Sequence, residues 1–127
     1  MDDFFFDRAY SEVMGAARNA KMGQVINLDV RKKIIDLELF SLPHLVSGII
    51  FKYQGRDVMA TPHMRENVVS VIDMESWKTV KRIRTLGPGF FMRSYENTPT
   101  LGSTCSSTNT GVSCMSSIRK PLRLSRR

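Results

Sequence analysis

Two stretches of this 127-residue chain share one pattern and decide its fold: Gln24-Val-Ile-Asn-Leu-Asp-Val-Arg-Lys-Lys-Ile-Ile-Asp-Leu-Glu-Leu39 and Asn67-Val-Val-Ser-Val-Ile-Asp-Met-Glu-Ser-Trp-Lys-Thr-Val-Lys-Arg-Ile83. Each is an apolar strand that ends in Asp, then a short polar turn and a second strand of alternating character. Asp29 and Asp73 are 44 residues apart. A period of about 40–45 residues is typical of a four-stranded propeller blade. The repeat therefore predicts an all-β fold.

The segments around the repeat supply the other strands that a blade needs. Residues 4–20 are interpreted as a strand pair, with a helix as the alternative for their second half. A strand, a turn at Gly55 and another strand are expected over 48–61, and 89–95 repeats the first of these. We expect about two blades over residues 1–100. Because propellers have about 4–8 blades, the chain is expected to be a fragment.

The net charge of +7 is unevenly distributed along the chain. Residues 1–100 carry 14 basic and 12 acidic side chains, whereas 101–127 carry five basic residues and no acidic one. A basic tail on a nearly neutral domain gives little support to a nucleic-acid function. No stretch has the ~20 apolar residues of a membrane span, and the acidic N-terminus is unlike an export signal. Cys105 and Cys114 match no metal-binding spacing.

The tail over 101–127 differs from the rest of the chain in composition. It is rich in serine and lacks aromatic and acidic residues, which predicts a disordered segment. When the codons are shifted by one constant offset, 101–107 can read Trp-Val-Asp-Val-Phe-Phe, and a second apolar strand ending in Asp is recovered about 45 residues after Asp73. We therefore hypothesise a frameshift near residue 100, so that the tail is out of frame.

Two Pro-His pairs, Pro43-His44 and Pro62-His63, interrupt the strands where a propeller loop would be. A neutral imidazole in such a loop can ligate iron or transfer a proton near pH 7. The alternative is a structural histidine that bonds to the backbone. Neither histidine has a partner at a chelating spacing, so no metal site made of protein ligands alone is expected. Gly87-Pro88-Gly89 is expected to be a tight loop whose glycines let the backbone approach a flat ligand.

In the order and spacing of several short motifs, residues 8–99 resemble the haem-d1 propeller family. The motifs are Leu42-Pro43-His44, Val58-Met-Ala-Thr-Pro-His63, Val71-Ile-Asp73, Trp77-Lys-Thr-Val-Lys-Arg-Ile83 and Gly89-Phe-Phe-Met-Arg-Ser94. The family comprises nitrite reductases of the cytochrome cd1 type and paralogues that act in haem d1 biosynthesis. The resemblance implies an eight-bladed β-propeller with haem d1 in its central channel. It also implies a periplasmic parent protein, whose export signal would lie outside this chain.

The resemblance assigns roles to four residues. His63 matches a distal histidine that assists the reduction of nitrite to nitric oxide, and His44 matches a histidine near the haem pocket. Tyr95 stands where the nitrite reductases have a second histidine, which puts nitrite reduction in doubt. Arg93 could pair with a carboxylate of the macrocycle. His63 is thus the catalytic candidate, and all four are candidates for cofactor binding.

The resemblance leaves the reaction open. One possible ligand is nitrite, with haem d1 as the cofactor, and the other is a haem d1 precursor. An electron-donor protein is a possible partner. The isolated fragment is expected to be inactive. The alternative class is a cofactor-free propeller that binds other proteins, with both histidines structural. No nucleic-acid or membrane partner is expected.

Overall fold

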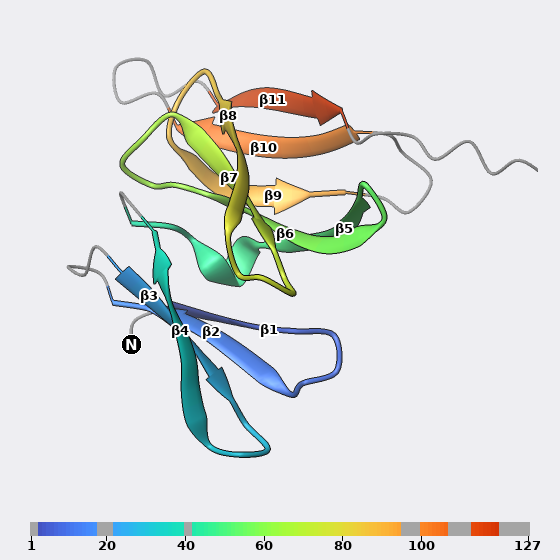
Figure 1. Ribbon diagram of the computed structural model, residues 1–127. Helices are drawn as coiled ribbons and strands as arrows, with labels where there is room; N and C mark the ends of the chain where they lie inside the picture. Colours follow the sequence, from blue (N-terminus) through green and yellow to red (C-terminus); the bar gives the residue numbers. More distant parts are fainter. Residues whose placement is uncertain (1–2, 18–21, 40–41, 95–99, 107–112, 120–127) are drawn as a thin grey trace, which may run out of the picture.

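The computed structural model describes residues 3–17, 22–39, 42–94, 100–106 and 113–119, and for 105–106 and 113–119 the backbone alone. These residues form eleven strands and one short 3₁₀ helix (Figure 1). The elements are β1 (Asp3–Phe6), β2 (Glu12–Ala16), β3 (Met22–Asn27), β4 (Lys32–Glu38), η1 (Leu45–Ser47), β5 (Ile49–Tyr53), β6 (Arg56–Pro62), β7 (Val68–Asp73), β8 (Thr79–Arg84), β9 (Gly89–Arg93), β10 (Thr100–Ser106) and β11 (Ser113–Arg119). The predicted all-β fold is confirmed.

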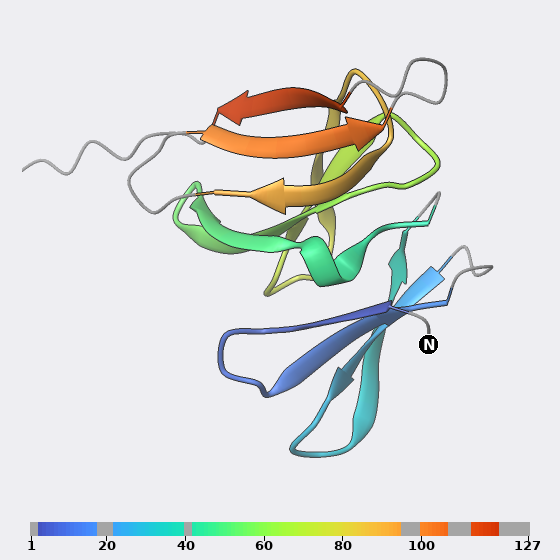
Figure 2. The same ribbon diagram turned by 180° about the vertical axis from the view of Figure 1, so that it is seen from behind.

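The strands form three antiparallel sheets in which each strand pairs with its neighbours in the chain. The orders are β1-β2-β3-β4, β5-β6-β7-β8 and β9-β10-β11. The sheet β5–β8 lies between the other two, as Figures 1 and 2 show from opposite sides. Two complete four-stranded sheets are the two predicted blades, and β9–β11 are three strands of another.

The third strand of the middle sheet, β7, is buried on both faces because a core lies on each side of it. Every residue of β7 is buried. Ile72 belongs to the core that the first sheet covers with Met14 and Leu37. The adjacent Val71 belongs to the core on the other side, with Leu101. Successive side chains of a strand point to opposite faces, so β7 serves two cores.

Matching side-chain turns end the third strand of the first two sheets. Asp73 Oδ1 accepts hydrogen bonds from the N–H groups of Glu75 and Ser76, at 3.0 and 2.8 Å. Asn27 Oδ1 accepts equivalent bonds from the N–H groups two and three residues further on, both at 3.0 Å. The structural partner of Asp73 is therefore Asn27 and not Asp29, as the repeat had suggested. Asn and Asp both favour this turn, so the two sheets close the same turn with different residue types.

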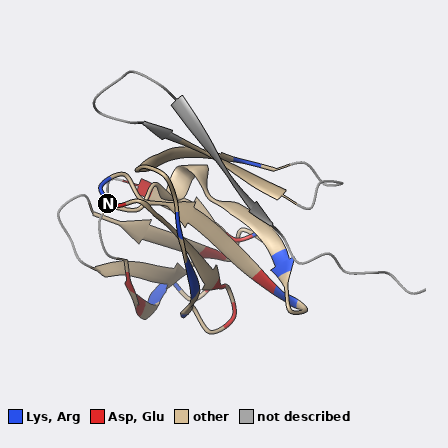
Figure 3. Cartoon of the chain, turned by 90° about the horizontal axis from the view of Figure 1, so that it is seen from above, with Lys and Arg blue, Asp and Glu red and all other residues tan. Residues whose placement is uncertain are grey.

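The fourth strands carry the exposed charges. β4 and β8 are the outer edges of their sheets, and most of their residues are exposed. Lysine and arginine on such strands oppose pairing with another chain. In Figure 3 the basic and acidic residues are interspersed along the described chain, without a broad field of one sign. No helix among the described residues is long and apolar enough to cross a membrane.

The prediction of a disordered tail over 101–127 was wrong for the residues that the structure describes there. β10 pairs with β9 and β11 pairs with β10, both antiparallel. Leu101 is fully buried in the second core. Pairing uses backbone groups that every residue type carries, and threonine favours strands, so the composition did not prevent a third sheet. Residues 107–112 and 120–127 lie outside the described residues.

Candidate functional site

Three loops that interrupt the strands meet at one end of the sheets and are joined through their backbones. The N–H of His44 donates to the carbonyl of Pro62 at 2.8 Å, and Pro43 forms an antiparallel bridge with His63. The N–H of Gly89 donates to the carbonyl of His63 at 3.0 Å. The two Pro-His pairs and the Gly87-Pro88-Gly89 loop, which are far apart in the sequence, thus form one cluster, which we call the loop cluster.

His44 is half-buried and lies in an aromatic corner of this cluster. Its ring centroid is 6.0 Å from that of Phe90 and 5.7 Å from that of Phe91, with both rings edge-on to it. The Nδ1 atom of His44 forms a hydrogen bond with the carbonyl of Phe90. The Ser47 hydroxyl lies 3.1 Å from the same Nδ1 atom. Aromatic faces beside an imidazole suit a flat apolar ligand.

The carboxylate of Asp3 holds the helical turn that follows His44. Asp3 Oδ1 accepts from the N–H of Val46 at 3.0 Å, and Asp3 Oδ2 accepts from the N–H of Leu45 at 2.5 Å. These are N–H groups at the start of η1, which have no partner within the helix. An acidic side chain at this end satisfies them and complements their partial positive charge. Asp3 thereby fastens β1 of the first sheet to the loop that carries His44.

His63 is almost fully buried, at 1% exposed. Its Nε2 atom lies 2.8 Å from the Ser70 hydroxyl of β7, which is itself buried. Among the described residues, the His63 ring is therefore surrounded by protein. The ring is bonded within the protein, which is the structural role weighed against a catalytic one. Its assignment as a catalytic and cofactor-binding residue stays a prediction.

Arg93, a third predicted site residue, does not join the loop cluster. Arg93 is exposed at the far end of β9, four residues from Gly89 and so about 13 Å along the strand. Its backbone pairs with Gly102. Tyr95 lies outside the described residues. The structure thus brings together His44 and His63, and leaves Arg93 apart from them.

A pocket of about 240 Å³ lies beside His44. It is lined by Asp3, Ala16, Ala17, Leu42, Pro43, His44, Val46 and Met64. Most of these side chains are apolar, and Asp3 and His44 are the titratable groups among them. A few polar groups on a mostly apolar wall are typical of a ligand site.

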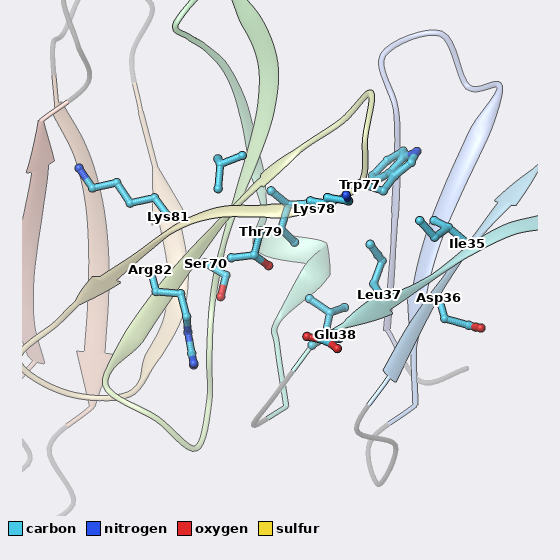
Figure 4. Close-up of a pocket in the computed structure, with 13 residues that line it drawn as sticks. Ile35, Asp36, Leu37, Glu38, Ser70, Trp77, Lys78, Thr79, Lys81 and Arg82 are labelled. Carbon is cyan, nitrogen blue, oxygen red and sulfur yellow. The ribbon is translucent and has the colours of Figure 1, made fainter.

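A larger groove of about 680 Å³ runs between the outer strands β4 and β8 (Figure 4). In Figure 4, Leu37, Asp36 and Trp77 lie toward the right of the groove, and Lys81 and Arg82 lie toward the left. The groove also reaches Ser70, whose hydroxyl contacts His63. It therefore touches the loop cluster only through Ser70, and His44 does not line it.

Two carboxyl groups of the described residues, Asp7 and Asp73, have lowered pKa values and lie at the opposite end of the strands. The hydrogen bond from the N–H of Ser76 is the main reason why the pKa of Asp73 is lowered, despite its burial. Burial acts to raise the pKa of Asp7, but the hydrogen bonds from Glu12 and Ser11 outweigh it and the net shift is downward. Both groups close turns, so their role is structural. Among the described residues, no three His, Cys, Asp or Glu side chains gather as a metal site.

Several residues of this site were not identified from the sequence. They are Asp3, Ser47, Ser70, Phe90 and Phe91. Ser47 has a weak local signal, because it follows a histidine by three residues. Asp3 has none, because the backbone groups that it binds are about 42 residues away. Phe90 and Phe91 are 42% and 57% exposed beside His44.

Comparison with known proteins gives a consistent family match. A profile described as "Cytochrome D1 heme domain" matches residues 4–109. Dihydro-heme d1 dehydrogenase from Pseudomonas aeruginosa strain PAO1 is 46% identical over 99 residues, which are 78% of this chain and 20% of that protein. The chain thus spans about a fifth of this curated relative.

Solved structures agree with the sequence matches. A structure described as dihydro-heme d1 dehydrogenase NirN in complex with DHE has a TM-score of 0.77 and 45% identity, covering 81% of this chain and 22% of that one. Hydrazine synthase from Kuenenia stuttgartiensis has a TM-score of 0.72 at 12% identity, over 92% of this chain and 32% of that one. A Cps50 (Swd1) β-propeller domain has a TM-score of 0.61 at 11% identity, over 98% and 40%. The last two show the fold alone.

Proposed function

Because this chain belongs to the cytochrome d1 heme domain family, we propose that its loop cluster forms part of the wall of a site for haem d1 or a haem d1 precursor. The observation that supports this most strongly is the convergence of His44, the two phenylalanines beside it and the Gly87–Gly89 loop. These features come from two segments far apart in the sequence, 43–44 and 87–91. A core needs no such arrangement of half-exposed aromatic rings and an imidazole.

The residues present fit one side of a tetrapyrrole. Phe90 and Phe91 offer apolar surface to a macrocycle, and His44 offers a nitrogen to its centre or edge. The pocket of about 240 Å³ beside His44 is smaller than the roughly 300–1,000 Å³ of ordinary small-molecule sites. Other parts of a parent protein would have to supply the remaining wall. When bound, the group supplies a redox-active iron and a conjugated ring.

Between the two activities of the family, we favour the biosynthetic one. The relative of 46% identity is a dihydro-heme d1 dehydrogenase. The chain also has Tyr95 where its likeness to the nitrite reductases would place a second distal histidine. Oxidation of a dihydro precursor and reduction of nitrite both need an electron-transfer partner. A periplasmic location of the parent protein belongs to the same proposal.

The proposal is tested by adding haem d1 to the purified chain and recording its visible spectrum. We expect a shifted spectrum with the unaltered chain and a loss of the shift with His44→Ala. His63→Ala tests the cofactor-binding role predicted for that residue; because its ring is buried against Ser70, its stability is measured alongside. A spectrum that shifts equally in the unaltered chain and in His44→Ala would refute the role of His44. No uptake by a chain that folds cooperatively would favour the cofactor-free interaction module.

A further inference from the structure

The polar contacts of the His44 ring are one-sided. Among the residues that the structure describes, both hydrogen-bond partners of the ring meet Nδ1: the Phe90 carbonyl and the Ser47 hydroxyl, the latter at 3.1 Å. Neither of them meets Nε2. The two nitrogens of a histidine are chemically distinct, and a contact at one decides what the other can do.

The chemistry of the two partners decides which nitrogen carries the proton. A backbone carbonyl can only accept a hydrogen bond, so the contact with Phe90 favours a hydrogen on Nδ1 of His44. The Ser47 hydroxyl has one hydrogen. Its oxygen lies 2.9 Å from the carbonyl oxygen of Phe90 and 3.1 Å from that of His44. When this hydrogen goes to either carbonyl, the oxygen of Ser47 can only accept from Nδ1. Both partners therefore favour the same tautomer.

The local fold holds both partners in place. Ser47 follows His44 by three residues, and residues three apart lie over one another in a 3₁₀ turn. The N–H of Ser47 donates to the His44 carbonyl at 3.2 Å, and Asp3 fastens the two intervening N–H groups. The Phe90 carbonyl belongs to β9, whose first residue Gly89 is bonded to the loop cluster.

We propose that Ser47 is a positioning residue: together with the Phe90 carbonyl it fixes His44 in the Nδ1-protonated form, so that Nε2 is the atom presented to a ligand. Nε2 then has a free electron pair and can accept a proton or coordinate a metal centre. The benefit to a haem d1 site rests on the proposed function, whereas the tautomer is a property of the ligand-free chain. His63 is held through Nε2 instead, by Ser70.

The chain has two histidines, so nuclear magnetic resonance of the ¹⁵N-histidine-labelled protein can assign both rings. Long-range proton–nitrogen couplings, recorded where the rings are neutral, show which nitrogen is protonated. We expect His44 protonated on Nδ1, although Nε2 is the more common site for a free side chain in water. His44 protonated on Nε2 in the unaltered chain would overturn the proposal.

Variants separate the role of Ser47 from that of the fold. Ser47→Ala should give His44 a population protonated on Nε2, while the His63 signals stay unchanged. Ser47→Thr keeps the hydroxyl and should restore the original pattern. Ser70→Ala is the matched control, because it should alter His63 alone. Unchanged His44 signals in a folded Ser47→Ala chain would show that Ser47 positions nothing.

A binding measurement distinguishes this inference from the proposed function. Loss of a group that orients a ligating histidine typically weakens binding about 10–100-fold, and we expect this of Ser47→Ala with haem d1. If His44 shows the expected tautomer but haem d1 does not bind, the proposed function fails and the inference stands. If haem d1 binds equally to both chains and the tautomer is the other one, the inference fails alone.

Discussion

The turn closed by Asp73 gives a sharp prediction, because the same turn is built with Asn27 in the neighbouring sheet. Asp73→Ala removes an acceptor for two backbone N–H groups and for the Ser76 hydroxyl at 3.1 Å. Hydrogen bonds to a charged group contribute about 1.5–3 kcal/mol each. Glu75 and Ser76 are exposed, so water can reach the freed groups. We expect the free energy of unfolding to fall by about 2–4 kcal/mol.

Asp73→Asn should be tolerated much better. An asparagine keeps the oxygen that accepts both N–H groups, as Asn27 does in the first sheet. The variant loses the ion pair between Asp73 and Arg56 Nη1 at 3.0 Å. The Arg56 side chain is 53% exposed and the Asp73 side chain 1% exposed, so water screens the pair from one side and we take the upper part of the about 0–1 kcal/mol of exposed pairs. We expect a loss of about 0–1 kcal/mol for Asp73→Asn.

Urea denaturation followed by circular dichroism measures both variants against the unaltered chain. The pH dependence checks the cause. The pKa of Asp73 is lowered from its ordinary value of 3.8, first by the N–H of Ser76, so the carboxylate stabilises the fold above that value. This contribution is lost as the pH falls through the lowered pKa, and Asp73→Asn should lack it. Equal losses for the alanine and asparagine variants would refute the assignment of the stability to the turn.

Three further predictions concern the third sheet and its coding sequence. Leu101→Ala should lower the free energy of unfolding by about 2–5 kcal/mol in a urea titration, because Leu101 is fully buried; a change within error would show that β10 is not packed. Gly89→Ala should lower stability by about 1–3 kcal/mol in a thermal melt, because the added Cβ would lie 2.7 Å from Pro62 Cβ and 2.9 Å from Ser103 Oγ; an unchanged melting temperature would contradict this close contact. Sequencing the coding DNA should show propeller sequence in a shifted frame beyond residue 100, and its absence would end the frameshift hypothesis.

Much of the fold could be predicted from strand periodicity and turn residues. The alternation in the repeat placed β3, β4, β7 and β8, and Gly55 takes a positive φ of 85° in the expected hairpin turn. The equivalence of Asp29 with Asp73 was wrong because a shift of two residues keeps the alternation of apolar side chains. Only the hydrogen bonds show that Asn27 ends its strand. The third sheet was missed because backbone pairing leaves little trace in composition.

The positions of the loops that form the site could be predicted, but the contacts of their side chains could not. The Pro-His pairs marked the places where the strands stop, and both lie in the loop cluster. Which histidine side chain is partly exposed depends on distant partners: Ser70 is 7 residues from His63, and Phe90 is 46 residues from His44. No local pattern encodes such contacts. The sequence therefore favoured His63, whereas the arrangement of contacts favours His44.

The double burial of β7 has a consequence for how the protein opens. Its amide hydrogens are covered by neighbouring strands on both edges and by side-chain cores on both faces. Exchange of these hydrogens with heavy water therefore requires both cores to come apart, whereas the edge strands β4 and β8 can fray alone. Val69, Val71 and Ile72 should be among the slowest amides to exchange. The rate at which they do so would report how long the loop cluster keeps its shape.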